Sequence, residues 1–135
     1  MNSKSLMIGD WVKSTDFSFQ CSSIGAACVR VAYQSRIYNI KENLLHPIPL
    51  TEEILALNGW HRTGYGWLEN DACKSIHVYY KWDAFKDEDT GRYVDYMTDF
   101  GVNGISGFEW VHEFQHYLRL VNHADIADNF RIKEE

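Results

Sequence analysis

The chain of 135 residues lacks several features that would assign it to a class at once. It has no run of about 18 apolar residues, so it predicts no membrane-spanning helix. Residues 1–7 carry one Lys and lead into no long apolar stretch, so we expect no secretory signal peptide. Only three cysteines occur, and no two of them form a C-x-x-C pair. We therefore expect Cys21, Cys28 and Cys73 to be free thiols in a reducing, cytoplasmic setting.

Loops that hold a phosphate, a nucleophile or calcium are missing as well. The sequence has no glycine-rich phosphate loop and no G-x-S-x-G turn. The acidic stretch 83–89 does not alternate its carboxylates toward a glycine at the sixth place, as a calcium loop would. No internal repeat or low-complexity segment is visible either.

Positive charge is scarce, and it is unevenly spread. The net charge is -6, which argues against general nucleic-acid binding. Residues 1–48 carry five Lys or Arg and three Asp or Glu, which gives +2, whereas residues 49–135 carry eight and sixteen, which gives -8. The simplest interpretation of the second part is a solvated acidic surface. The first part stays a candidate for an anionic partner, and thus for a weak nucleic-acid-associated module.

Composition and the two prolines predict an α+β chain of two small lobes. Hydrophobic residues make up 45% and charged residues 24%, as in an ordinary globular protein. Pro47 and Pro49 disfavour helix in the residues before them, so they predict an extended joint. We place a β-barrel-like lobe at residues 1–48 and an α+β lobe at residues 49–135.

Alternating apolar residues predict strands in the first lobe, near residues 7–12, 17–21, 27–33 and 36–40. Several short strands within about 45 residues indicate a small barrel or a strongly bent sheet. The opening Gly-Asp-aromatic-Val resembles the first strand of SH3-like barrels. Such an analogy bears on the fold and not on function.

The second lobe is predicted to be a helix, an antiparallel sheet and a C-terminal helix. Thr51 is a good helix N-cap and Asn58-Gly59 a good stop. The remaining pattern predicts strands at 60–62, 66–68, 73–82 and 92–97, a turn at 83–91, and a final helix over 107–121.

One motif in the final helix has a chemical meaning. Residues 112–116 read HEFQH, a match to H-E-x-x-H. Two histidines four apart on a helix can hold one zinc, and the glutamate between them can act as base on a metal-bound water. This spacing makes His112, His116 and Glu113 the candidate residues of a zinc-dependent hydrolase.

Two observations weigh against a zinc site. Arg119 and Asn122 stand where the metzincin extension of the motif has Gly and His, so a third ligand would have to come from elsewhere, for example His61 or His77. A helical wheel also places both histidines on the polar side of the helix. We therefore predict no catalytic zinc there, and a stability change within about 0.5 kcal/mol for His116→Ala. The predicted buried face contains Trp110, Phe114, Leu118 and Val121, packed on the second-lobe sheet, and the predicted exposed side chains are Glu109, His116 and Arg119.

Two weaker patterns have a structural interpretation. Cys73 and His77 could form a thiol–imidazole pair, but no third group orients them. A row of aromatic residues could stack on sugars or bases, although core packing is the simpler interpretation. That row consists of Trp60, Trp67, Tyr79, Tyr80 and Trp82.

Three motifs together resemble a family of small uncharacterised proteins of gut anaerobic bacteria and their phages. They read L-x-x-G-D-x-V at residues 6–12, P-I-P-L-T-x-E-I-L-x-x-N-G-F at 47–60 and V-H-x-L-Q at 111–115, with Trp60 in place of Phe and Phe114 in place of Leu. The resemblance covers most of the chain and implies no activity.

The resemblance also bears on the HEFQH motif. The family pattern includes His112 and Gln115 but does not require Glu113 or His116, which implies that the HEFQH match is accidental. Gln115 is expected to bond to a neighbouring sheet.

The leading hypothesis is a non-enzymatic accessory or interaction module of phage or mobile-element origin, without metal or cofactor, acting on a protein partner and not on a membrane. A zinc-dependent hydrolase and a nucleic-acid-associated module remain the alternatives.

Overall fold

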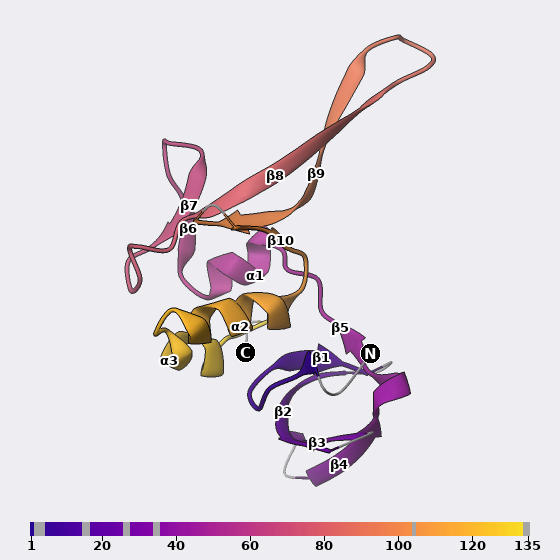
Figure 1. The fold of residues 1–135 in the computed structure, drawn as a ribbon, viewed down its shortest axis with the longest axis vertical. Helices are drawn as coiled ribbons and strands as arrows, with labels where there is room; N and C mark the ends of the chain where they lie inside the picture. The colour runs from indigo at the N-terminus through magenta and orange to yellow at the C-terminus, as the bar shows by residue number, and fades with distance from the viewer. Residues whose placement is uncertain (2–4, 15–16, 26–27, 34–35, 104, 134–135) are drawn as a thin grey trace. The chain divides into compact units, whose positions relative to one another are not determined.

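In the computed structural model the chain is described except at residues 2–4, 15–16, 26–27, 34–35, 104 and 134–135. It is α+β, as predicted, with two antiparallel sheets of five strands each (Figure 1). It forms two compact units, one of residues 1–49 and 110–135 and one of residues 50–109. This differs in one respect from the predicted division at residue 48, because the C-terminal residues belong with the first strands.

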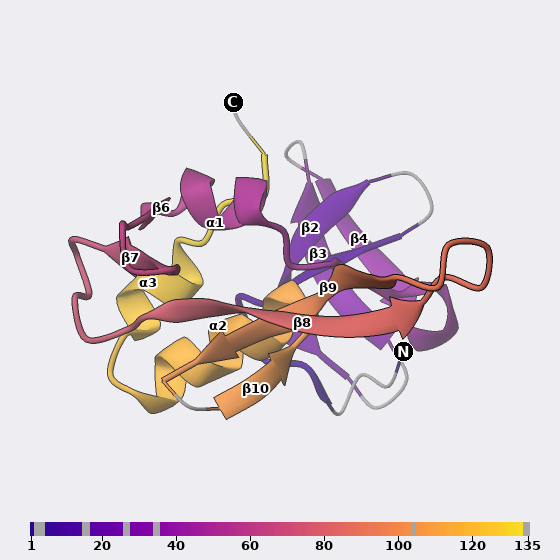
Figure 2. The same ribbon diagram turned by 90° about the horizontal axis from the view of Figure 1, so that it is seen from above.

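The sheet of the first unit has the strand order β4-β3-β2-β1-β5. Figure 2 shows β2, β3 and β4 side by side. Its buried alternate positions include Val12, Phe19, Val29 and Val31, which explains why a period of two was visible in the sequence. Within the described residues no pairing joins β4 to β5, so no closed barrel is present there. The strands are β1 (Trp11–Lys13), β2 (Ser18–Ile24), β3 (Cys28–Tyr33), β4 (Arg36–Lys41) and β5 (His46–Pro47), with a 3-10 turn at Glu42–Leu44.

Two helices complete the first unit. The helix α2 (Val111–Leu120) is shorter than the predicted 107–121, because β10 (Ile105–Phe108) occupies the residues where the helix was expected to begin. The short helix α3 (Ala124–Asp128) follows in a tail that had been expected to be irregular. Phe114 and Phe130 meet at a centroid distance of 5.9 Å, which packs the end of the chain against α2.

The second unit has one helix and a sheet of order β10-β9-β8-β7-β6. The helix α1 (Glu52–Leu57) begins as predicted, since the Thr51 hydroxyl accepts the Ile54 N–H at 3.2 Å. It ends as predicted at Asn58, and Gly59 follows with φ +96°. The remaining strands are β6 (Trp60–Arg62), β7 (Trp67–Asn70), β8 (Val78–Lys86) and β9 (Tyr93–Val102).

The longest strands, β8 and β9, differ from the prediction. Strand β8 starts at Val78 and continues through Asp83, which had been assigned to a turn. The turn occupies residues 87–92 only, where Asp87 N–H donates to Arg92 O and Gly91 N–H to Asp87 O. The outer part of β8 is exposed and contains the acidic Asp83, so its sequence resembled that of a loop.

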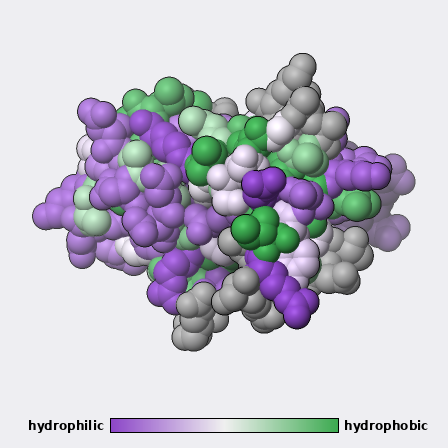
Figure 3. All heavy atoms as spheres, turned by 90° about the horizontal axis from the view of Figure 1, so that it is seen from below, coloured by the Kyte–Doolittle hydropathy of each residue, from purple (hydrophilic) through white to green (hydrophobic). Residues whose placement is uncertain are grey.

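The described helices include none that is long and apolar enough to cross a membrane. On the face drawn in Figure 3, hydrophobic residues occur in several separated groups among hydrophilic ones.

Candidate functional site

The HEFQH residues lie on α2. Its three candidate residues differ in their surroundings: Glu113 caps the helix, His116 contacts Asp10, and His112 is buried. The Glu113 carboxylate accepts the backbone N–H of Trp110 at 3.0 Å, which satisfies an otherwise unpaired donor at the start of the helix. A carboxylate that caps its own helix is not positioned as a base on a metal-bound water. Glu113 therefore stabilises the N-terminus of α2.

His116 contacts a fully buried carboxylate. Its Nε2 atom lies 2.6 Å from Oδ2 of Asp10, whose exposed fraction is 0%. The guanidinium of Arg119, one turn further along α2, donates to the other oxygen of Asp10. The side chain of Arg119 is only 12% exposed. Buried charge is costly unless it is paired and hydrogen-bonded, and this carboxylate is both.

The turn that carries Asp10 requires glycine before it. Gly9 has φ +92°, and a Cβ there would come within 2.9 Å of Arg119 Nη2. Asp10 Oδ2 also accepts the Met7 N–H at 2.7 Å, so the carboxylate closes its own turn. The turn is bonded to β2 at Cys21, since Gly9 N–H donates to Cys21 O and Cys21 N–H donates to Asp10 O. The Gly9-Asp10 turn is thus the part of the first unit that α2 binds through its polar side chains.

Gln115 makes the second connection between α2 and the first strand. It is fully buried, and its Oε1 accepts the Trp11 N–H at 2.9 Å. Its Nε2 donates to Gly9 O at 2.9 Å and to Ala127 O at 2.8 Å. One amide therefore joins β1, the turn before it and α3. The expectation that Gln115 bonds to a sheet is met by its bond to β1.

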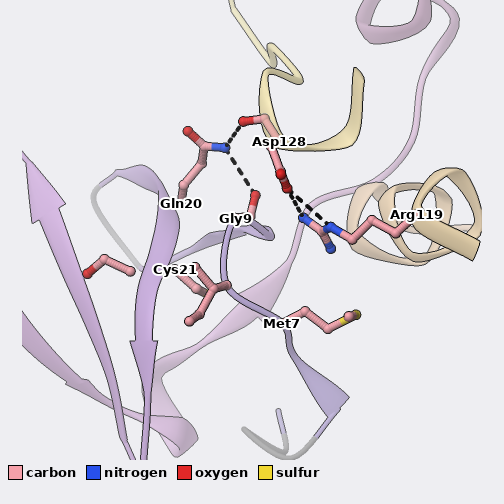
Figure 4. Close-up of a pocket in the computed structure, with 8 residues that line it drawn as sticks. Met7, Gly9, Gln20, Cys21, Arg119 and Asp128 are labelled. Atoms are coloured by element: carbon pink, nitrogen blue, oxygen red, sulfur yellow. Dashed lines mark hydrogen bonds and ion pairs between the residues drawn. The ribbon is translucent and has the colours of Figure 1, made fainter. Parts of the chain in front are cut away.

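The C-terminal residues close this cluster from the other side. Figure 4 shows Gln20 reaching both Gly9 O and Asp128 O, each at 3.0 Å, and Arg119 facing the Asp128 carboxylate at 3.3 Å. The indole N–H of Trp11 donates to Phe130 O at 2.6 Å. These bonds explain why the C-terminal residues group with the N-terminal sheet.

His112 is buried, with an exposed fraction of 7%. Its ring stands edge-on to that of His116 at a centroid distance of 5.7 Å. Within the described part of the chain, Nδ1 of His112 has no hydrogen-bond partner. Burial lowers the pKa of His112 below its ordinary value of 6.5, since desolvation disfavours the charged imidazole. His112 is thus best described as a neutral packing residue.

The helical wheel was therefore only partly right about the polar side of the helix. Glu109 is exposed as predicted, but His112 is buried and His116 and Arg119 are partly buried, whereas Val121 is exposed and Trp110 is only half-buried. Phe114 and Leu118 are buried as predicted. The reason is that Asp10 and the backbone of its turn bind the polar side of the helix, so polarity there did not signal solvent.

A hollow of about 950 Å³ lies beside the cluster, lined among others by Met7, Gly9, Cys21 and Arg119 (Figure 4). The thiol of Cys21, in the wall of this hollow, is not activated. Burial and the charge of Asp10 raise the pKa of Cys21 to about 12, so the thiolate is scarcely populated at neutral pH.

The other candidates are dispersed within the second unit. Cys73 is buried in a turn, and His77 precedes β8 instead of lying on a strand, with its ring stacked on Trp67 at 5.2 Å. Of the aromatic row, Trp60 is core, while Trp82 is 61% exposed. His61 is exposed on β6. Among the described residues, no group of three His, Cys, Asp or Glu side chains is arranged to hold a metal ion.

A surface that the motifs did not indicate lies on the hairpin of β8 and β9. A register shift separates Lys81 from Trp82, and from there outward the strands pair as Trp82↔Met97 through Lys86↔Tyr93. We call residues 82–97 the arm. Within the described chain, β7 reaches β8 only at Val78 and Tyr79, and β10 reaches β9 only at residues 100–102, so the arm's two strands pair only with each other.

The arm is apolar on both of its faces. Opposed residues of a hairpin share a face, which places Trp82, Tyr93 and Met97 on one side. Phe85, Val94 and Tyr96 share the other side, where the rings of Phe85 and Tyr96 lie 5.9 Å apart. All six are more than two-fifths exposed, with Tyr93 the most exposed at 73%.

Comparison with models of protein families, with curated proteins and with solved structures finds no match for this chain.

Proposed function

We propose that the protein is a non-enzymatic interaction module of phage or mobile-element origin, and that the arm is its contact surface for another protein. The observation that carries this proposal is the arm itself. A two-stranded ribbon is marginally stable in water, because too little of its apolar surface is covered. Contiguous exposed apolar side chains are typical of interaction sites. A partner that covers the arm would account for both.

The charged cluster around Asp10 supports the same proposal indirectly. Its donors and acceptors are used within the unit: Gln115 bonds to three backbone groups and Asp10 to two side chains and one N–H. Glu113 caps its own helix. Glu113 and His116 thus already have partners within the first unit, which makes the zinc-dependent hydrolase the weaker proposal.

The setting in phages or mobile elements comes from the three-motif resemblance. Two of those motifs, G-D-x-V and V-H-x-x-Q, meet in space through Gly9, Trp11 and Gln115. These two motifs therefore describe how the first unit is built, and none of the three motifs includes a residue of the arm. An SH3-like character of the first unit is a further proposal, supported by its short antiparallel strands.

The test is the size of the particle that the full chain forms in cells that produce it naturally. A triple variant, Trp82→Ser with Phe85→Ser and Tyr93→Ser, removes three of the four exposed aromatic side chains of the arm and leaves the inner half of the sheet unchanged. We expect the wild type to sediment in the extract as an assembly larger than 15.8 kDa, and the variant as a single chain. The matched control is Tyr65→Ser, since Tyr65 is 76% exposed in the same unit but outside the arm. Identical sedimentation of all three proteins would overturn the proposal.

A further inference from the structure

We propose that the partner of the arm is a second copy of this chain, and that two copies exchange arms so that each arm lies on the outer face of β3 and β4 of the other copy. This inference rests on the proposed function of the arm. It adds the identity of the partner and the surface that receives the arm.

The first support is charge. The arm, residues 82–97, contains five acidic residues and two basic ones, which gives a net charge of -3. The segment of β3 and β4, residues 28–41, contains three basic residues and no acidic one. Complementary potentials steer association and fix its register. The acidic residues are Asp83, Asp87, Glu88, Asp89 and Asp95, and the basic residues of the receiving strands are Arg30, Arg36 and Lys41. Arg36 pairs with Tyr33 and lies on the opposite face of the sheet, so Arg30 and Lys41 are the basic residues of the receiving face.

The second support is the form of the receiving face. Strand register places Arg30 opposite Asn39 and Cys28 opposite Lys41, so these side chains share one face of the sheet. Arg30, Asn39 and Lys41 are exposed there, and the neighbouring Ile37 is 71% exposed. A hollow of about 550 Å³ opens there, lined by Cys28, Asn39, Lys41, Glu42 and Asn43. The exposed Arg30 and Lys41 are the basic side chains with which carboxylates of the arm can pair on this face.

The third support is the two-sided apolar character of the arm. A single flat surface covers only one face of a ribbon. In a symmetric pair, one face of each arm meets the receiving sheet and the other face meets the second arm near the two-fold axis. Exchange between two identical chains also closes the assembly, since each arm and each receiving face is used once.

The fourth support is area. A buried aromatic side chain contributes about 150–250 Å². Weighted by the exposed fractions of Trp82, Phe85, Tyr93 and Tyr96, the arm offers roughly 450 Å² of aromatic surface. The arm faces that meet each other cover one another, so two arms and the two receiving sheets then bury roughly 1,400 Å², within the range of a standard stable interface.

The test uses charge reversal in the full chain, measured by sedimentation of the purified protein without nucleic acid. One variant reverses the arm tip (Asp87→Lys, Glu88→Lys, Asp89→Lys), and the other reverses the receiving face (Arg30→Glu, Lys41→Glu). Each variant alone places like charges against each other. A one-to-one mixture of the two restores opposite charges at both contacts.

We expect the wild type to form a dimer of twice 15.8 kDa that weakens as salt rises from about 0.1 M to about 0.5 M. Each variant alone should bind itself at least about a hundredfold more weakly, and the mixture should dimerise. A control with three reversals elsewhere, Glu53→Lys, Asp71→Lys and Asp125→Lys, should dimerise as the wild type does. Circular dichroism of each variant verifies that it is folded. Dimerisation of the mixture would also show that both variants are folded.

A wild type that stays monomeric at every concentration would overturn the arm exchange. If the natural extract nevertheless contains an assembly that depends on the arm, the proposed function stands with a different protein partner. An assembly that appears only with added RNA or DNA, and that the receiving-face variant abolishes, would instead assign this face to a nucleic acid. A mixture that stays monomeric while the wild type dimerises would place the interface elsewhere.

Discussion

Replacing Gln115 by Ala removes the amide that joins β1, its preceding turn and α3. Two of its three partners keep another bond: Gly9 O still accepts from Gln20, and Ala127 O from the Asn129 N–H. The Trp11 N–H loses the Gln115 acceptor, and an unsatisfied buried donor costs about 1–3 kcal/mol. The cavity left by a fully buried side chain adds to this cost, so we expect a loss of roughly 2–4 kcal/mol in the free energy of unfolding.

The assay combines urea unfolding with hydrogen exchange at the Trp11 amide. The variant should be less stable by that amount, and the Trp11 amide should exchange faster. Leu120→Ala is the control, because Leu120 lies on the same helix and is 83% exposed, so its loss should stay within about 0.5 kcal/mol. A loss below about 1 kcal/mol for Gln115→Ala, with the Trp11 amide still protected, would refute the assigned role of α2.

Three further predictions concern the same helix. Burial lowers the pKa of His112 in the folded chain, so its contribution to stability is present above pH 6.5 and is lost as pH falls through the folded-state pKa. The free energy of unfolding, measured over this pH range, should show that loss in the wild type and not in His112→Leu. His116→Ala should lower the free energy of unfolding in urea by roughly 1–2 kcal/mol, and not by the 0.5 kcal/mol expected from a surface position, since it removes a partner of buried Asp10. No measurable change would show that Arg119 alone is enough to stabilise the buried carboxylate. Protein purified without an affinity tag should contain no zinc by elemental analysis; about one zinc per chain, lost on mutating either histidine, would restore the hydrolase.

Patterns of period and capping predicted much of the fold. Alternation found β2, β3 and β4, and Thr51 with Asn58 and Gly59 gave the bounds of α1, because these signals act locally. The strand predicted near residues 7–12 is only Trp11–Lys13, and the short β5 was not predicted. The start of α2 was misplaced, since a glycine-containing strand, β10, immediately precedes it.

The polar interior of the first unit could not be predicted in the same way. Asp10 and His116 are 106 residues apart, and no local pattern records that a buried carboxylate binds the polar side of a distant helix. The one usable signal was the pair of motifs themselves, because Gly9-Asp10 and His112 with Gln115 belonged to one resemblance. The arm was missed because its acidic residues resemble a loop, and only the register of β8 with β9 shows which apolar residues share a face.

The central claim is that this protein contacts its partner through the arm and not through the charged cluster. The most direct measurement places a photo-crosslinking amino acid at Tyr93 or, separately, at Ile8, which is 65% exposed beside the hollow near Arg119. After irradiation in cells that produce the protein naturally, we expect a protein adduct from position 93 and none from position 8, with a mass of two chains if the partner is a second copy. An adduct from position 8 and none from position 93 would contradict the account.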